Sequence, residues 1–156
     1  MADTSDKANP STSSLLSRLY KTSNLDDVRD FIETYDGEFI STPFHQHIQK
    51  LSAERNLIPE HIIKNCGIDR NYGHQLFSGI RQPSRDKVIQ LAFGFPLTVE
   101  ETQDLLKIAG KSPLYPKIKR DAVLLYCLKN QICFMEAQAA LQELSLRLLG
   151  REGRYE

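Results

Sequence analysis

The apolar residues of this chain recur at spacings of three and four, which places them along one side of an α-helix. The pattern returns in eight or nine short segments that are joined by short connections. No segment alternates apolar and polar residues in the way that a half-buried strand does. We therefore expect an all-α protein, with a helical hairpin on each side of a central five-helix module.

The N-terminal region divides into a tail and a hairpin. Residues 1–14 are rich in Ser, Thr, Asp and Pro and show no periodicity, so we expect a flexible tail. Residues 15–42 contain two amphipathic segments and are expected to form an acidic helical hairpin. Asn24 is a favourable N-cap for its second helix, and Asp26 and Asp27 then lie at the positive end of the helix dipole.

Caps and glycines divide residues 43–110 into five expected helices. Gly67, Gly79 and Gly110 stand where helices commonly end in left-handed backbone. Glu101 lies three residues after a threonine and predicts a capping box. The expected helix starts are Thr42-Pro43, Pro59, Asp69, Ser84 and Thr98.

Residues 111–150 are expected to form a C-terminal hairpin, with helices at about 117–129 and about 134–149, and residues 151–156 a tail. Two short patterns recur here at a spacing of 35 residues. They are Arg85-Asp86-x-Val88, which returns as Arg120-Asp121-x-Val123, and Glu101-x-Gln103-x-x-Leu106, which returns as Glu136-x-Gln138-x-x-Leu141. The hairpin is either a second copy of residues 84–110 or a coincidence among helices of similar composition.

The composition is that of an ordinary globular chain, with 156 residues of which 40% are hydrophobic and 26% charged. The chain has no run of 18 apolar residues and no basic-then-apolar leader, so we expect a cytoplasmic protein without a membrane segment. No Ser-His-Asp or Cys-His signature, phosphate-binding glycine loop or carboxylate pair is visible. An enzyme is therefore not expected.

The cysteine and histidine residues do not indicate a metal or another cofactor. Cys66, Cys127 and Cys133 never form a C-x-x-C pair and lie in apolar helical contexts, so we expect reduced core thiols. His45 and His47 are two residues apart, and such positions point in different directions on a helix. Neither a disulfide nor a zinc site is expected.

The net charge is zero, but the charges are unevenly distributed. Residues 1–42 hold 4 basic and 8 acidic side chains, residues 43–121 hold 12 and 8, and residues 122–156 hold 4 and 4. The mildly basic middle favours phosphate locally, although it is less basic than a typical nucleic-acid-binding domain. A separate basic cluster is interpreted as the solvated start of a helix. It consists of Lys117, Lys119 and Arg120.

Residues 57–79 have the build of a helix-turn-helix. A short helix is followed by the turn Gly67-Ile68 and by a second helix. The glycine permits a sharp change of direction, and the apolar residue after it anchors the turn. The outer face of the second helix is then free to bind a ligand.

In this region the chain resembles the lambda-repressor and Cro regulators, known as the Xre type. The likeness covers residues 43–110. The run Gln75-Leu-Phe-Ser-Gly79 and the following Ile80-Arg-Gln-Pro-Ser84 look like the end of the recognition helix and its loop, and residues 84–95 and 97–106 look like the family's last two helices. The chain also looks like a group of bacterial Xre-like proteins in which a short acidic hairpin precedes the module and a helical pair follows it. The resemblance implies a DNA-binding transcriptional regulator.

The resemblance further implies that residues 69–78 form a recognition helix that enters the major groove of double-stranded DNA. Arg makes bidentate contacts to guanine, and Asn or Gln makes them to adenine. The implied base contacts are Arg70, Asn71, His74 and Gln75, and the implied backbone contacts are Tyr72, Ser78, Arg81, Gln82 and Arg85. The alternatives are an ordinary solvated helix face and ordinary surface charge, and Tyr72 has the core as an alternative.

Three positions depart from the family pattern. Pro59 stands where the family commonly has a phosphate-binding Gln, and proline has no backbone N–H to donate. Gly73 replaces an apolar β-branched residue, which predicts lost packing and a helix less stable by about 0.5–1 kcal/mol. Phe77 replaces a Glu late in the recognition helix.

Two functional classes remain open. A regulator would act as a dimer, because one small module contacts few base pairs. Apolar residues of the C-terminal helices would either form the dimer surface or simply fill the core. They are Val123, Leu124, Leu125, Cys127, Leu128, Phe134, Leu141, Leu144 and Leu148. The other class is an adaptor that binds a protein partner at the acidic hairpin of residues 24–37 and has no DNA role.

Overall fold

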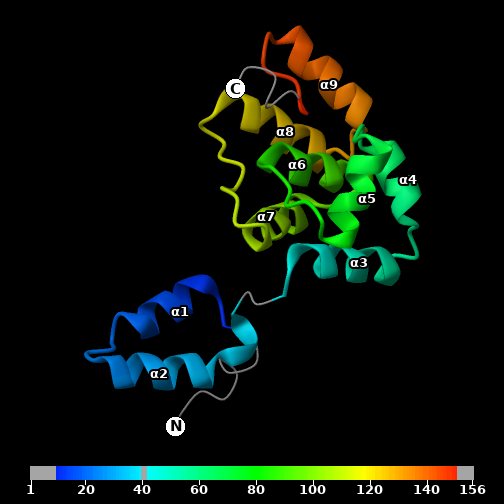
Figure 1. Cartoon of the computed structure of the whole chain (residues 1–156). Coiled ribbons are helices and arrows are strands. Elements are labelled where there is room, and N and C mark those ends of the chain that lie inside the picture. Colours follow the sequence, from blue (N-terminus) through cyan, green and yellow to red (C-terminus); the bar gives the residue numbers. More distant parts are fainter. Residues whose placement is uncertain (1–9, 40–41, 151–156) are drawn as a thin grey trace. The chain divides into compact units, whose positions relative to one another are not determined.

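The computed structural model describes residues 10–39 and 42–150 (Figure 1). Over these residues the regular structure is entirely helical, with nine α-helices, one 3₁₀ turn and no strand. The expected all-α class is confirmed. The chain divides into two compact units, residues 1–41 and 42–156, and each is described by itself.

The first unit is a helical hairpin. Its elements are α1 (Thr12–Leu19), α2 (Leu25–Thr34) and the 3₁₀ turn η2 (Asp36–Glu38). Ser11 caps α1, because its hydroxyl accepts a hydrogen bond of 3.1 Å from the backbone N–H of Ser14. The expected tail is therefore wrong for residues 12–14: a serine cap starts the helix before its first apolar residue. Asn24 caps α2 as expected, with its Oδ1 2.9 Å from the backbone nitrogen of Asp27. Residues 1–9 lie outside the described part of the chain.

Aromatic side chains join the parts of this hairpin. Arg18 donates a hydrogen bond to the hydroxyl of Tyr35, and its guanidinium carbon lies 5.6 Å from the centre of that ring. The ring of Phe31 is 5.0 Å from that of Tyr35 and 6.2 Å from that of Phe39. No residue of α1 or α2 is buried, so these two helices have no core of their own.

Within residues 42–150 the second unit contains seven helices. They are α3 (Phe44–Glu54), α4 (Pro59–Asn65), α5 (Arg70–Ser78), α6 (Arg85–Gly94), α7 (Val99–Ile108), α8 (Lys119–Lys129) and α9 (Phe134–Glu143). The side chains of Asp69, Ser84 and Thr98 cap α5, α6 and α7 as expected, and Glu101 completes the capping box. Pro43 is the N-cap of α3 rather than its first residue.

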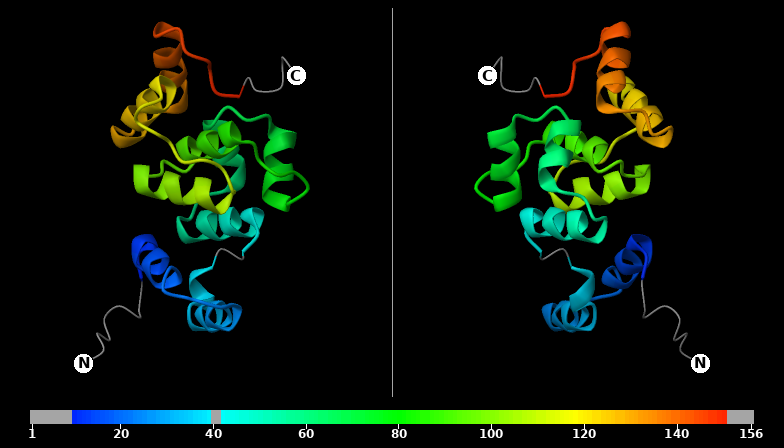
Figure 2. Two further views of the ribbon diagram at one scale, coloured as in Figure 1. Left: turned by 90° about the vertical axis from the view of Figure 1, so that its left-hand side faces the viewer. Right: turned by 90° about the vertical axis from the view of Figure 1, so that its right-hand side faces the viewer.

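Helix α6 forms the centre of this unit. Figures 1 and 2 show it with α3 and α7 on one side and with α8 and α9 on the other. Eight of its residues are buried, including the polar Asp86 and Gln90. Complete burial of an aliphatic side chain contributes about 1.5–3 kcal/mol to the free energy of unfolding. The contacts of α6 with α4, α7 and α9 therefore hold the unit together. The largest apolar side chains buried there are Ile48, Ile62, Leu76, Ile89, Leu91, Phe95, Leu97, Leu105, Leu106, Leu124 and Leu141.

The last helix is shorter than expected. It ends at Glu143, although apolar residues continue at helical spacing to about residue 149. Ser145 has left-handed backbone, with φ 56°, and the chain then returns toward the core as a loop that buries Leu149. An apolar loop residue fits the same spacing as a helical one, so periodicity alone gave the wrong end. Residues 151–156 lie outside the described ranges.

Matching hydrogen bonds recur at the spacing of 35 residues. The side-chain amide of Gln103 pairs with both backbone groups of Leu114 at 2.8 Å. Gln138 pairs in the same way with Leu149, at 2.9 and 2.8 Å. A coincidence of composition does not produce matching long-range contacts, so the geometry favours a structural repeat of residues 84–110 in the C-terminal hairpin.

The two repeats hold each other through two ion pairs, which we call the arginine clasp (Arg85, Asp86, Arg120 and Asp121). Arg120 of α8 binds Asp86 of α6 at 2.7 and 2.9 Å, and Arg85 of α6 binds Asp121 of α8 at 2.8 and 3.2 Å. Each arginine also donates to two carbonyl groups of the loop that follows its own pair of helices. These are Ser112 and Pro113 for Arg85, and Arg147 and Leu148 for Arg120. The clasp therefore joins the first turns of α6 and α8.

Candidate nucleic-acid interface

Helix α5 is fixed at both of its ends. The carboxylate of Asp69 accepts a hydrogen bond of 3.2 Å from the backbone N–H of Tyr72. At the other end Gly79 has left-handed backbone, with φ 83°, and Gln49 of α3 donates to the carbonyl of Phe77. These interactions hold the helix in place without using its outer face.

The inner face of α5 packs closely on α4. Gly73 is buried, and a Cβ atom there would lie 2.6 Å from both Cγ1 and Cγ2 of Ile63. The side chain of Ile63 thus occupies the space that a β-branched residue 73 would fill. The expected loss of packing at Gly73 is wrong, because α4 supplies the missing atoms. Leu76 and Phe77 are also buried, which places Phe77 in the core.

The outer face of α5 is polar. Arg70, Asn71, His74 and Ser78 are exposed, and Gln75 is half-buried. Four of the five are implied base contacts, and Ser78 is an implied backbone contact. They project from one rigid helix and can reach a ligand together.

Glu60 of α4 binds two residues of this face. Nε of Arg70 donates to Oε1 of Glu60 at 2.6 Å, and Nε2 of His74 lies 2.6 Å from Oε2. The hydrogen bonds from His74 and Arg70 lower the pKa of the Glu60 carboxyl below its ordinary value. Glu60 was not predicted from the sequence, because no spacing links it to residues ten and fourteen positions later. Only the packing of α4 on α5 brings them together.

Two cations lie near the ring of Tyr72. The guanidinium carbon of Arg81 is 4.9 Å and the Nζ of Lys87 is 5.3 Å from the centre of its ring. Arg81 also donates to the side-chain oxygen of Gln75. Cations near an aromatic face remain able to bind an anion, so this cluster suits a phosphate group. Gln82 is exposed beside it, on the loop between α5 and α6.

Arg85 does not belong to this surface. Its guanidinium is taken up by Asp121 and by the carbonyls of Ser112 and Pro113, and the side chain is 25% exposed. Arg85 thus has a structural role in the arginine clasp, and the backbone contact that the resemblance implies for it stays a prediction. The recurrence of Arg-Asp at a spacing of 35 was the sequence signal for this role.

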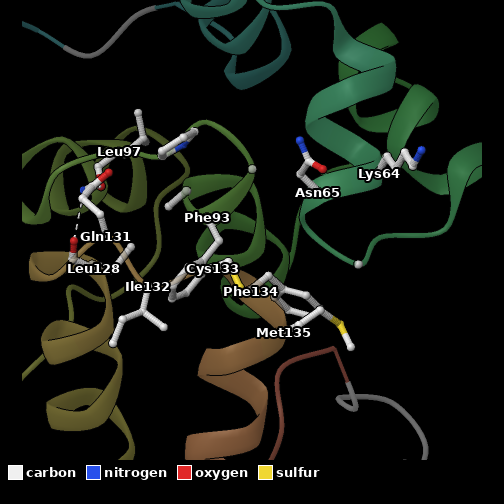
Figure 3. A pocket seen from close by; sticks show the side chains of 14 residues that line it. Lys64, Asn65, Phe93, Leu97, Leu128, Gln131, Ile132, Cys133, Phe134 and Met135 are labelled. Carbon is white, nitrogen blue, oxygen red and sulfur yellow. Dashed lines mark hydrogen bonds between the residues drawn. The ribbon is translucent and has the colours of Figure 1, made fainter.

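A cavity of about 450 Å³ lies beside the turn that follows α4 (Figure 3). Asn65 lies on its α4 side, and Ile132 and Phe134 lie on the side of the α8–α9 turn. The ring of Phe134 lies directly against Gly67, where any side chain would collide with it. The C-terminal hairpin thus supports the turn between α4 and α5.

The three cysteines differ in their surroundings. Burial raises the pKa of Cys66 to about 11 and also raises that of Cys127, which keeps both thiols protonated. Cys133 is exposed, so the expectation of three core thiols is wrong for this residue. It stands at the N-cap of α9, at the rim of the cavity rather than within the core.

Most of the apolar residues proposed for a dimer surface are not available for one. Five of the nine are buried in the core of the unit, as the alternative interpretation holds. They are Leu124, Cys127, Leu128, Phe134 and Leu141. Of the others, Leu144 is 59% exposed.

Within the described ranges, no three His, Cys, Asp or Glu side chains lie together as a metal-binding group. None of the described helices combines the length and the apolar character needed to span a bilayer.

Comparison with known proteins gives no match. No protein-family model, curated protein or solved structure is significantly similar to the chain.

Proposed function

We propose that the chain is a sequence-specific, DNA-binding transcriptional regulator of the Xre type. In this proposal α4, the turn at Gly67 and α5 form a helix-turn-helix, and α5 enters the major groove. The main support is the outer face of α5, where Arg70, Asn71 and His74 are exposed together on a helix whose other side is buried.

The chemistry of this face suits base edges. The amide of Asn71 makes no hydrogen bond within the described residues and is available to adenine. Arg70 suits guanine once it leaves Glu60, and an exposed ion pair of this kind costs little to break. Arg81 and Gln82 would bind phosphate groups beside the base contacts, which fixes the register of α5 in the groove.

Selection from a random duplex library tests this proposal, followed by fluorescence anisotropy of the enriched duplex at increasing KCl. A DNA reader enriches a motif, and its affinity falls with salt at a slope of about −0.9 per phosphate contact. Arg70→Ala with Asn71→Ala should abolish the preference for the motif. Gln75 is left intact because it also holds Arg81. Absence of an enriched motif together with absence of salt-dependent binding would overturn the proposal.

Lys129→Ala is the matched control, because Lys129 is exposed at the end of α8 farthest from the arginine clasp. This variant should bind the enriched duplex as the wild type does. An equal loss in Lys129→Ala and in the Arg70 and Asn71 variant would mean that the measured binding is general charge attraction.

The second candidate is a protein-binding adaptor. It is supported by the first unit, where Tyr20 and Leu25 are 78% and 71% exposed beside the acidic residues of α2. An adaptor would show no binding to any duplex. Substitution of Arg70 and Asn71 would leave its partner binding unchanged.

A further inference from the structure

The arginine clasp also determines which charges surround the first turn of α8. Asp86 and Asp121 are 3% and 1% exposed, and each is matched by an arginine of the other repeat. The clasp therefore removes two acidic side chains from the surface. The charges that remain at this end of α8 are lysines.

The segment that leads into α8 is strongly basic. Residues 105–120 contain five basic and no acidic side chains. Arg120 is used by the clasp, and Lys107 lies 4.0 Å from Asp104. Lys117 and Lys119 are exposed, and no carboxylate of residues 10–39 or 42–150 forms an ion pair with either of them.

The same clasp places these lysines next to the start of α6. Asp121 of α8 is 2.8 Å from Arg85, which is the first residue of α6 and follows the loop that carries Arg81 and Gln82. Lys119 is two residues before Asp121 and Lys117 four. The clasp therefore joins the chain segment that carries the two lysines to the start of α6, although the two segments are far apart in sequence.

We propose that Lys117 and Lys119 contact the phosphate backbone of duplex DNA beside the site read by α5. This inference rests on the proposed function and extends it to the C-terminal hairpin. The repeat then has a functional consequence: it joins a second cationic segment to the first turn of α6, which follows the α5–α6 loop. Contacts to phosphate add affinity without sequence preference. These lysines therefore lengthen the stretch of DNA that the protein covers and leave the preferred base sequence unchanged.

The test compares the wild type with Lys117→Ala/Lys119→Ala on the enriched duplex between 50 and 200 mM KCl. Two lost phosphate contacts reduce the salt slope by about 1.8, so the affinity difference between the two proteins changes about tenfold over this range. The loss should be the same for the enriched motif and for a scrambled duplex. The Lys129→Ala protein should keep the wild-type slope.

Each other outcome has a defined meaning. If the wild type binds the duplex and the double variant keeps the full slope, this inference is overturned while the proposed function stands. If no duplex binds the wild type, the proposed function fails and this inference fails with it. A loss confined to the motif would make the lysines base contacts and would also overturn the inference. Circular dichroism of the double variant should show an unchanged melting temperature, because both side chains are exposed.

Discussion

The side chain of Ile63 in α4 fills the space next to Gly73 of α5 where a side chain would otherwise lie. A Cβ atom at residue 73 would lie 2.6 Å from Cγ1 and Cγ2 and 2.8 Å from Cδ1 of Ile63. Both residues are buried. An isoleucine is branched at Cβ and cannot easily move these atoms aside. The absence of a side chain at position 73 therefore sets how closely the two helices approach.

Gly73→Ala should destabilise the protein even though alanine favours helix. The collision with Ile63 costs about 1–3 kcal/mol, whereas the gain in helix propensity is about 1 kcal/mol. Ile63→Ala removes the colliding atoms at its own cost of about 2–5 kcal/mol. In that background Gly73→Ala should become stabilising by about 1 kcal/mol. Urea denaturation of the four proteins measures the coupling, and an equal effect of Gly73→Ala in both backgrounds would disprove the contact.

Removal of the charge of Glu60 should strengthen DNA binding. Glu60→Gln loosens Arg70 and His74 and removes a negative charge near the phosphates. A unit charge about 7 Å from a phosphate, in a water-like dielectric, changes the affinity for DNA by about threefold. Anisotropy with the enriched duplex measures this change. The control is Glu100→Gln, an exposed carboxylate on α7 that should have no effect. Weaker binding by Glu60→Gln would instead indicate that the carboxylate itself contacts a base, such as the amino group of cytosine.

The arginine clasp should dominate the stability of the C-terminal hairpin. Arg120→Met leaves the Asp86 carboxylate buried without its arginine, which costs about 3–5 kcal/mol. Asp86→Asn added to this variant should recover part of the loss, because the buried charge is then absent. Arg85→Met should cost less, since the Arg85 side chain is 25% exposed and that of Arg120 10%. Thermal denaturation compares the melting temperatures of these variants with that of the wild type. Equal melting temperatures for Arg120→Met and the wild type would contradict the prediction.

The capping box of α7 should make stability depend on pH. The hydrogen bond from the backbone of Thr98, and then that from Arg55, lower the pKa of Glu101 below its ordinary value of 4.5. A lowered folded-state pKa gives a stabilisation that is complete above about pH 4.5 and is lost as the pH falls through the folded value. Glu101→Gln should therefore cost about 0.5–1 kcal/mol at pH 7, and this difference should shrink toward pH 3.

Urea denaturation between pH 3 and 7 gives this difference directly. The control is Glu100→Gln, on the preceding residue of the same helix, which leaves the capping box of Thr98 and Glu101 intact. A difference between wild type and Glu101→Gln that stays constant with pH would mean that the charge of Glu101 does not stabilise the fold.

The sequence alone predicted the local features of the fold. Asn24, Asp69, Ser84 and Thr98 cap the helices that they were expected to cap, and Gly79 has the left-handed backbone expected after α5. These predictions depend on hydrogen bonds between residues three positions apart and on the conformational freedom of one residue. Such interactions depend only on residues that are close together in the sequence, so a short stretch of sequence is enough to predict them.

Only the tertiary structure decided which helix faces meet. Ile63 fills the space at Gly73, Glu60 binds Arg70 and His74, and the basic cluster at the start of α8 joins the start of α6 through Arg120. Periodicity shows that a face is apolar or charged but not which other face it contacts. Those choices depend on packing between segments that are far apart in the chain, so a local pattern cannot specify them.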